Sequence, residues 1–124
     1  MKLTVNSVLH GLNLALAEGL VLAEKAGVDR ATAYEVFAAS VIAAPFVHYK
    51  REAFEHPGEV PVAFSLDLVA KDLDLILALA ASAGVPMEQA ATNARVVEAA
   101  VAAGLGDHDL SELATYLRGS ADDA

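Results

Sequence analysis

The chain of 124 residues is 56% hydrophobic and 6% aromatic, carries a net charge of −9 and has no cysteine. Its length suits one domain with a core of its own, and the missing cysteines exclude disulfides and thiolate metal sites. The negative charge argues against a nucleic-acid face, because phosphate binding needs clustered lysine and arginine. Alanine and leucine favour helices, and no segment alternates cleanly between apolar and polar residues, so an all-α fold is predicted.

The first predicted helix runs from about residue 2 to residue 26 and ends at Gly27, which suits a left-handed C-cap. Its apolar side chains point in nearly every direction, and such a helix is expected inside a protein. Four polar residues nevertheless share one face of it, namely Lys2, Asn6, His10 and Asn13. Polar groups buried without partners are costly, so this polar stripe is predicted to be paired or to line a site. The polar interruptions also leave the helix short of the roughly 20 apolar residues that a membrane span needs.

Turn and capping residues delimit five further helices. Their predicted ranges are, in chain order, about 30–39, 45–55, 65–83, 87–103 and 110–118. Asp29, Pro45 and Asp109 mark the starts of the first, second and last of these, and Gly84 follows the third. Pro86 is expected in the first turn of the fourth, which Gly104 and Gly106 close. Asp109 and Glu112 together resemble a capping box. Residues 1–118 are thus predicted to form one helical domain, followed by a frayed acidic tail over 119–124.

The predicted helix that starts near Ser65 has two apolar faces. The face expected in the core holds Leu66, Val69, Leu73, Ile76 and Leu77. The opposite stripe holds Phe64, Leu68 and Leu75, with Lys71 in its middle and Asp67, Asp72 and Asp74 beside it. Lys71 has two interpretations: a solvated residue in an ordinary i,i+4 ion pair with Asp67, or a cation that meets an anionic ligand at the edge of a cleft.

Three potential metal ligands lie at helical spacing in the polar segment, namely His48, Glu52 and His56. One helix face with this spacing could hold a divalent cation. The flanking Lys50 and Arg51 and the proline that follows favour a solvated face instead, so no metal site is predicted. No nucleophile-elbow context supports hydrolase chemistry either.

Four segments carry a resemblance to a known family. They are K-x-x-x-N at 2–6 before a helix that ends in AEGLVLAEKAGVD at 17–29, FSLDLVAKDLDL at 64–75, AGVPM at 83–87 and GLGDHDLS at 104–111. In this order and spacing they resemble the second domain of β-hydroxyacid dehydrogenases, a family that includes 3-hydroxyisobutyrate dehydrogenase and, more distantly, 6-phosphogluconate dehydrogenase. The resemblance implies an all-α bundle of about six helices around a long buried N-terminal helix, like the C-terminal domain of 6-phosphogluconate dehydrogenase.

The same resemblance implies a role for five residues. Lys2 would be the catalytic lysine, which passes a proton to or from the substrate oxygen as a hydride moves. Asn6 would hydrogen-bond the substrate, and Lys71, Phe64 and Asp72 would face the cofactor. The cofactor would be NAD or NADP, held mainly by an N-terminal Rossmann domain whose G-x-G-x-x-G motif is absent from this chain. The chain is therefore expected to be an isolated helical domain without dehydrogenase activity of its own.

The resemblance further implies a homodimer that acts on a small hydroxy acid. The absence of cysteine is compatible with the cytoplasm, and the charge and the interrupted apolar stretch argue against a nucleic acid or a membrane as partner. A lysine at position 2 favours an alcohol–carbonyl couple over the chemistry of the related imine reductases. The alternative is a non-catalytic helical module for dimerisation or interaction that has kept the fold. The sequence leaves open which hydroxy acid is used and whether the nucleotide is NAD or NADP.

Overall fold

The computed structural model describes residues 1–123, and within that range the chain is helical with no strand. Its elements are α1 (Lys2–Lys25), α2 (Arg30–Ala38), α3 (Pro45–Tyr49), α4 (Arg51–Glu55), α5 (Leu66–Ala83), α6 (Glu88–Ala100), the π-helical turn η1 (Val101–Leu105), the 3₁₀ turn η2 (Leu110–Glu112) and α7 (Leu113–Asp123). The predicted all-α bundle is confirmed.

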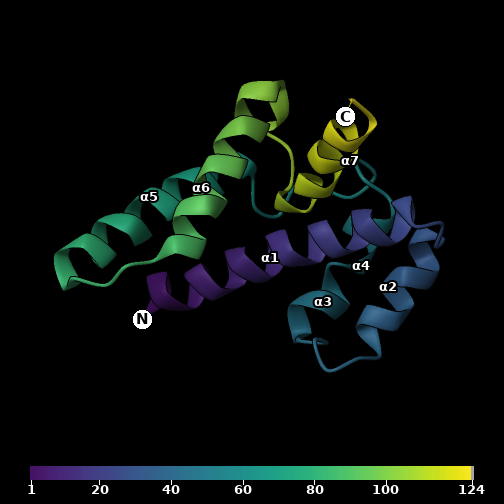
Figure 1. Cartoon of the computed structure of the whole chain (residues 1–124), viewed down its shortest axis with the longest axis horizontal. Coiled ribbons are helices and arrows are strands. Elements are labelled where there is room, and N and C mark those ends of the chain that lie inside the picture. The colour runs from purple at the N-terminus through teal and green to yellow at the C-terminus, as the bar shows by residue number, and fades with distance from the viewer. Residues whose placement is uncertain (124) are drawn as a thin grey trace.

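Helix α1 is the central element of the bundle. It runs along the long axis of the molecule, with α5 and α6 beside its N-terminal half and α7 and α2 beside its C-terminal half (Figure 1). Its buried apolar side chains lie mainly in that second half, and they are Leu14, Leu16, Ala17, Leu20 and Val21. Other apolar residues of α1, including Val5, Val8 and Leu22, are exposed. The expectation that α1 is buried on all sides is therefore wrong for this chain, because its neighbours cover only part of its circumference.

Contrary to the expectation from its polar interruptions, α1 is long and apolar enough to cross a membrane, and it is the one such helix among residues 1–123. Within its most apolar window, 44% of the residues are buried inside the domain. Its polar residues His10 and Asn13 are buried and hydrogen-bonded to other parts of the chain. The buried, hydrogen-bonded polar residues are typical of a helix that packs within a bundle, while more than half of the window is left uncovered by the other helices.

Local capping explains where the long helices begin and end. After α1, Val28 N donates to Ala23 O at 2.9 Å and Gly27 N donates to Glu24 O at 3.1 Å, with φ of +97° at Gly27. This is a Schellman motif, which places glycine at the left-handed position. Helix α5 begins where Ser65 Oγ accepts from Leu68 N at 3.2 Å. The predicted ends of α1 and the predicted start of α5 are confirmed.

Four helix boundaries differ from the sequence-based expectation. The single helix predicted from Pro45 is divided into α3 and α4 at Lys50, where the backbone leaves the helical region. Pro86 lies before α6 rather than in its first turn, and α6 gives way to η1 at residue 101. The tail predicted over 119–124 is helical as far as Asp123, with residue 124 outside the described range.

Candidate functional site

The polar stripe of α1 meets α5 at a single carboxylate. Asn6 Nδ2 donates a hydrogen bond to Asp72 Oδ2 over 3.0 Å, and His10 Nε2 lies 3.0 Å from the same oxygen. Asn6 and His10 are four residues apart, so consecutive turns of α1 present both groups to Asp72. The core face of α5, which includes Leu73 and Ile76, packs into the hydrophobic core and so orients Asp72 toward α1. The prediction that the stripe is paired is confirmed for these two residues.

This cluster has a closed inner side and an open outer side. The His10 side chain is 0% exposed, and the Phe64 ring lies against it with the ring centroids 5.5 Å apart. Nδ1 of His10 is buried without a hydrogen-bond partner. The Asp72 side chain is 18% exposed and Asn6 is half-buried, so a ligand could reach the cluster only from the side of these two residues.

Asn13 is the innermost residue of the stripe and belongs to the core rather than to the site. Its Nδ2 donates to the backbone oxygen of Leu110 at 2.9 Å, which connects α1 to η2. Both residues are buried. Asn13 therefore satisfies a backbone acceptor within the protein, as expected for a polar group in a helical core.

The two lysines predicted to act in the site are both exposed. Lys2 lies one turn before Asn6 on α1, and Lys71 precedes Asp72 on α5. Within the part of the chain that the structure describes, neither lysine forms an ion pair, so the i,i+4 pair of Lys71 with Asp67 does not occur. The structure thus brings Asn6, Asp72 and Phe64 together around His10, and it leaves the two ammonium groups exposed on the same two helices.

A buried ion pair that the sequence did not predict holds Phe64 in place. Lys50 Nζ lies 2.6 Å from Asp109 Oδ2, and the two side chains are only 8% and 6% exposed. The other carboxylate oxygen accepts from Ala63 N at 3.0 Å and from Phe64 N at 3.4 Å. Leu110 N also donates to Phe64 O at 2.8 Å, so Phe64 is fixed on both sides of its backbone.

The environment of Asp109 favours its charged form. Burial by itself would raise the pKa of this carboxyl, but hydrogen bonds from Lys50 and Ser111 outweigh burial and lower the pKa below its usual value. The expectation of a solvated Lys50 is wrong, because its side chain is buried in an ion pair with Asp109, which lies 59 positions further along the chain. Asp109 does cap η2 through Ser111 N, but Glu112 contacts His108 Nδ1 at 3.0 Å instead of completing a capping box.

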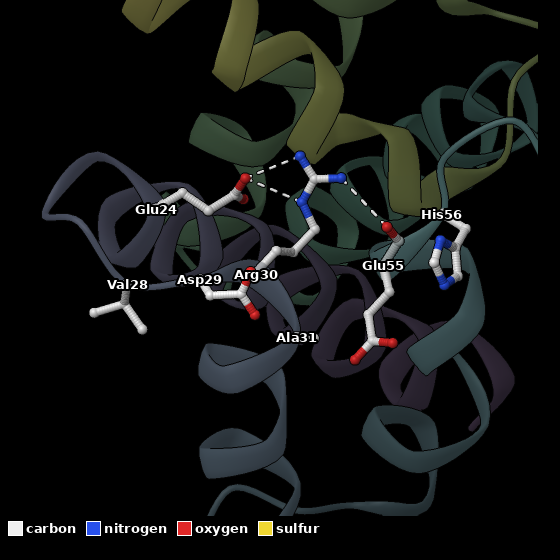
Figure 2. Close-up of a pocket in the computed structure, with 7 residues that line it drawn as sticks. All are labelled: Glu24, Val28, Asp29, Arg30, Ala31, Glu55 and His56. Carbon is white, nitrogen blue, oxygen red and sulfur yellow. Dashed lines mark hydrogen bonds and ion pairs between the residues drawn. The ribbon is translucent and has the colours of Figure 1, made fainter.

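A second polar cluster lies at the other end of α1, about 21 Å along the helix axis from His10. There a surface hollow of about 550 Å³ is bordered by residues of α1, α2 and α4 (Figure 2). The Arg30 guanidinium points between the Glu24 carboxylate at 2.9 Å and the backbone oxygen of Glu55 at 3.3 Å. Glu24 also accepts from Arg118 at 2.8 Å. Because these charges already have partners, the cluster is a junction between helices rather than a ligand site.

Glu24 illustrates the electrostatics of this junction. Burial alone would raise the pKa of the Glu24 carboxyl, whereas hydrogen bonds from Arg118 and Arg30 lower it, and the net change is a lowered pKa.

The three potential metal ligands noted in the sequence do not form a site. His48, Glu52 and His56 are exposed, and no group of three potential metal ligands comes together within residues 1–123.

A family model and several known proteins match most of this chain. A family model described as "NAD-binding of NADP-dependent 3-hydroxyisobutyrate dehydrogenase" matches residues 1–117. The chain is 36% identical over 108 residues to 2-(hydroxymethyl)glutarate dehydrogenase of Eubacterium barkeri, covering 86% of this chain and 36% of that protein. It is 34% identical over 115 residues to the cytokine-like nuclear factor N-PAC of Aedes aegypti, covering 92% of this chain and 20% of that protein.

The fold has close counterparts among solved structures. Mycobacterium tuberculosis 3-hydroxyisobutyrate dehydrogenase, solved with L-serine, superposes with a TM-score of 0.78 and 29% identity, covering 94% of this chain and 42% of that one. Fold and sequence together define an all-helical domain of the β-hydroxyacid dehydrogenase class. The chain belongs to the 3-hydroxyisobutyrate dehydrogenase family. It spans about a third of the length of the Eubacterium barkeri relative.

Proposed function

We propose that the chain is the helical substrate domain of an NAD(P)-dependent dehydrogenase that interconverts a small 3-hydroxy acid and its semialdehyde. The observation that carries this proposal is the hydrogen bond of 3.0 Å from Asn6 to Asp72. It joins the K-x-x-x-N segment of α1 to the K-D segment of α5, so two motifs of the family contribute to one cluster. The names of two relatives, 2-(hydroxymethyl)glutarate dehydrogenase and 3-hydroxyisobutyrate dehydrogenase, support a hydroxy acid as the substrate.

Lys2 is the proposed catalytic residue. Its ammonium gives a proton to the carbonyl oxygen during reduction, and the neutral amine takes a proton from the hydroxyl during oxidation. A bound nicotinamide would supply or accept the hydride. Lys2 is exposed and forms no ion pair among residues 1–123, so its Nζ is accessible to a substrate. Asn6, one turn further along α1, is proposed to hydrogen-bond the same substrate.

Lys71, Phe64 and Asp72 are proposed to face the cofactor. Lys71 lies in an exposed stripe with Leu68 and Leu75, so it presents a cation on a surface against which a second domain could close. The chain contains no G-x-G-x-x-G turn for a pyrophosphate. We therefore propose that NAD or NADP is held mainly by a separate nucleotide-binding domain.

The role of Lys2 can be tested in a protein that joins this domain to a nucleotide-binding domain. Lys2→Met is expected to lower kcat for oxidation of a short 3-hydroxy acid by about 10²- to 10⁴-fold, the usual contribution of general acid–base catalysis. Lys25→Met, at the far end of the same helix, is the matched control and should retain the original kcat. Equal kcat values for the two variants would contradict the assignment.

The 124-residue chain by itself is proposed to be inactive, because hydride transfer needs a bound nicotinamide. The purified chain should show no change in absorbance at the NADPH band when it is mixed with a short semialdehyde and either reduced nucleotide. A control with the two-domain protein should show turnover. Substantial turnover by the 124-residue chain would refute this part of the proposal.

Exposed apolar side chains support the proposal of a homodimer. Val5 and Val8 are exposed on α1, and Leu75 and Leu79 are exposed on α5. Between α1 and the C-terminal half of α5 lies an almost wholly apolar groove of about 280 Å³. Exposed apolar surface of this kind is typical of protein–protein interfaces. Light scattering should give the mass of a dimer for the purified chain, and a monomer at all accessible concentrations would contradict the proposal.

A second candidate function is a helical interaction module without catalysis. It is favoured by the similarity to N-PAC, a relative whose name describes a nuclear factor rather than a dehydrogenase. The gene sequence upstream of the codon for Met1 distinguishes the two candidates, because an intact G-x-G-x-x-G motif there favours the enzyme and its absence favours the module.

A further inference from the structure

We propose that His10 is a positioning residue that sets the orientation of the Asn6 carboxamide through Asp72. The inference rests on the proposed function, in which Asn6 hydrogen-bonds a hydroxy acid. His10 itself is fully buried and has no path to a substrate. Its effect must therefore pass through the carboxylate that it shares with Asn6.

The first step concerns the imidazole of His10. A carboxylate oxygen can only accept hydrogen bonds, so the 3.0 Å contact with Asp72 Oδ2 requires a proton on Nε2 of His10. Nδ1 is buried without a partner, so no competing hydrogen bond favours the other tautomer. The Phe64 ring packs against the imidazole and restricts its rotation. The geometry thus selects one tautomer and one ring orientation.

The second step concerns the carboxamide of Asn6. Its Nδ2 donates to Asp72 Oδ2, and a flipped amide would place oxygen against oxygen at 3.0 Å. Asp72 therefore fixes which end of the amide faces inward. The second N–H of Asn6 Nδ2 is not used by Asp72, so it can donate a hydrogen bond to an oxygen of the substrate. The ligand class that suits this donor is a short hydroxy acid, whose oxygen accepts from Asn6 while its hydroxyl proton stays available to Lys2.

The third step is the dependence of Asp72 on His10. The Asp72 side chain is partly exposed and lies at the outer edge of the cluster. The structure gives it two donors, one of which is the immobile His10. Without His10 the carboxylate would have Asn6 as its remaining donor here and could rotate toward water. The amide of Asn6 would then lose its fixed orientation.

Nuclear magnetic resonance of the ¹⁵N-labelled 124-residue chain tests this inference without any activity measurement. His10→Ala is expected to shift the Asn6 side-chain amide resonances, and His10→Gln is expected to restore them, because glutamine Nε2 can take the place of histidine Nε2. His56→Ala is the matched control, since His56 is exposed and lines the hollow at the other end of α1 from His10. Unchanged Asn6 resonances in a folded His10→Ala chain would overturn the inference.

A second measurement covers the case in which His10→Ala does not fold. In the unsubstituted chain, two-bond ¹⁵N–¹H correlations report the tautomer of His10 directly. The Nε2–H form is expected, and the Nδ1–H form would overturn the inference.

The consequence for function is measured in the two-domain protein. His10→Ala is expected to raise KM for the hydroxy acid about tenfold, which corresponds to one lost hydrogen bond, with KM for the nucleotide unchanged and His10→Gln close to the original. An equal rise in both KM values would overturn the inference. If the two-domain protein shows no dehydrogenase activity at all, the proposed function fails, and the resonance measurements still decide the role of His10.

Discussion

Replacement of Asp109 should strongly destabilise the fold. Asp109→Ala removes the acceptor of Lys50 Nζ at 2.6 Å, of Ser111 Oγ at 2.6 Å and of the Ala63 amide at 3.0 Å. The Lys50 ammonium, which is almost fully buried, would then have no partner. Breaking a buried pair by removing one member costs about 3–5 kcal/mol. We therefore expect the free energy of unfolding to fall by about that amount.

Urea unfolding followed by circular dichroism at the helical band measures this loss. Asp122→Ala is the control, because Asp122 pairs with Lys25 and both side chains are well exposed. Such surface pairs contribute about 0–1 kcal/mol. The double variant Lys50→Met/Asp109→Ala should be more stable than Asp109→Ala alone, since no buried charge is left without a partner. The reasoning would be refuted if Asp109→Ala cost no more than Asp122→Ala.

Two further predictions concern hydrogen bonding and pH. Tyr34 is fully buried and its hydroxyl donates to Val47 O at 2.6 Å, so Tyr34→Phe should cost about 1–2 kcal/mol in urea unfolding; an unchanged midpoint would show that the backbone oxygen finds another donor. The lowered pKa values of Asp109 and Glu24 mean that their contribution to stability is fully present above the ordinary carboxyl range and is lost as the pH falls through those lowered values. The free energy of unfolding should therefore drop steeply below about pH 4 and less steeply in Asp109→Asn, and equal slopes for the two proteins would contradict the assignment.

Features set by neighbouring residues were predictable from the sequence. Gly27 ends α1 and Ser65 starts α5 as expected, because each capping motif involves residues within a few positions of one another. The polar stripe of α1 was also predictable, since helical spacing alone places Asn6 and His10 on one face. Its pairing was expected in general terms, and Asp72 entered the candidate site only through the resemblance to a family.

Features set by distant residues were not predictable in the same way. Lys50 lies among polar residues, and the local pattern predicts a solvated side chain, but Asp109 pairs with it from a segment 59 positions further along the chain. The expected tail is helical because α7 packs along α1, where Lys25 pairs with Asp122. His10 was recognised as a polar residue in an apolar helix, yet its partner lies 62 positions away on α5. Tertiary contacts of this kind leave no periodic signal in the sequence.

The hydrogen bonds at Ala63 and Phe64 isolate the His10 cluster from movements of the connection that precedes them. Upstream, the connection from Pro57 to Val62 is largely exposed and crosses the surface. Downstream, the amides of Ala63 and Phe64 are tied to Asp109, and the oxygen of Phe64 is tied to Leu110. Insertions or deletions in the connection should therefore be absorbed before they reach the aromatic ring beside His10. Homologues could differ in loop length here and still keep the arrangement of Phe64, His10 and Asp72 beyond it.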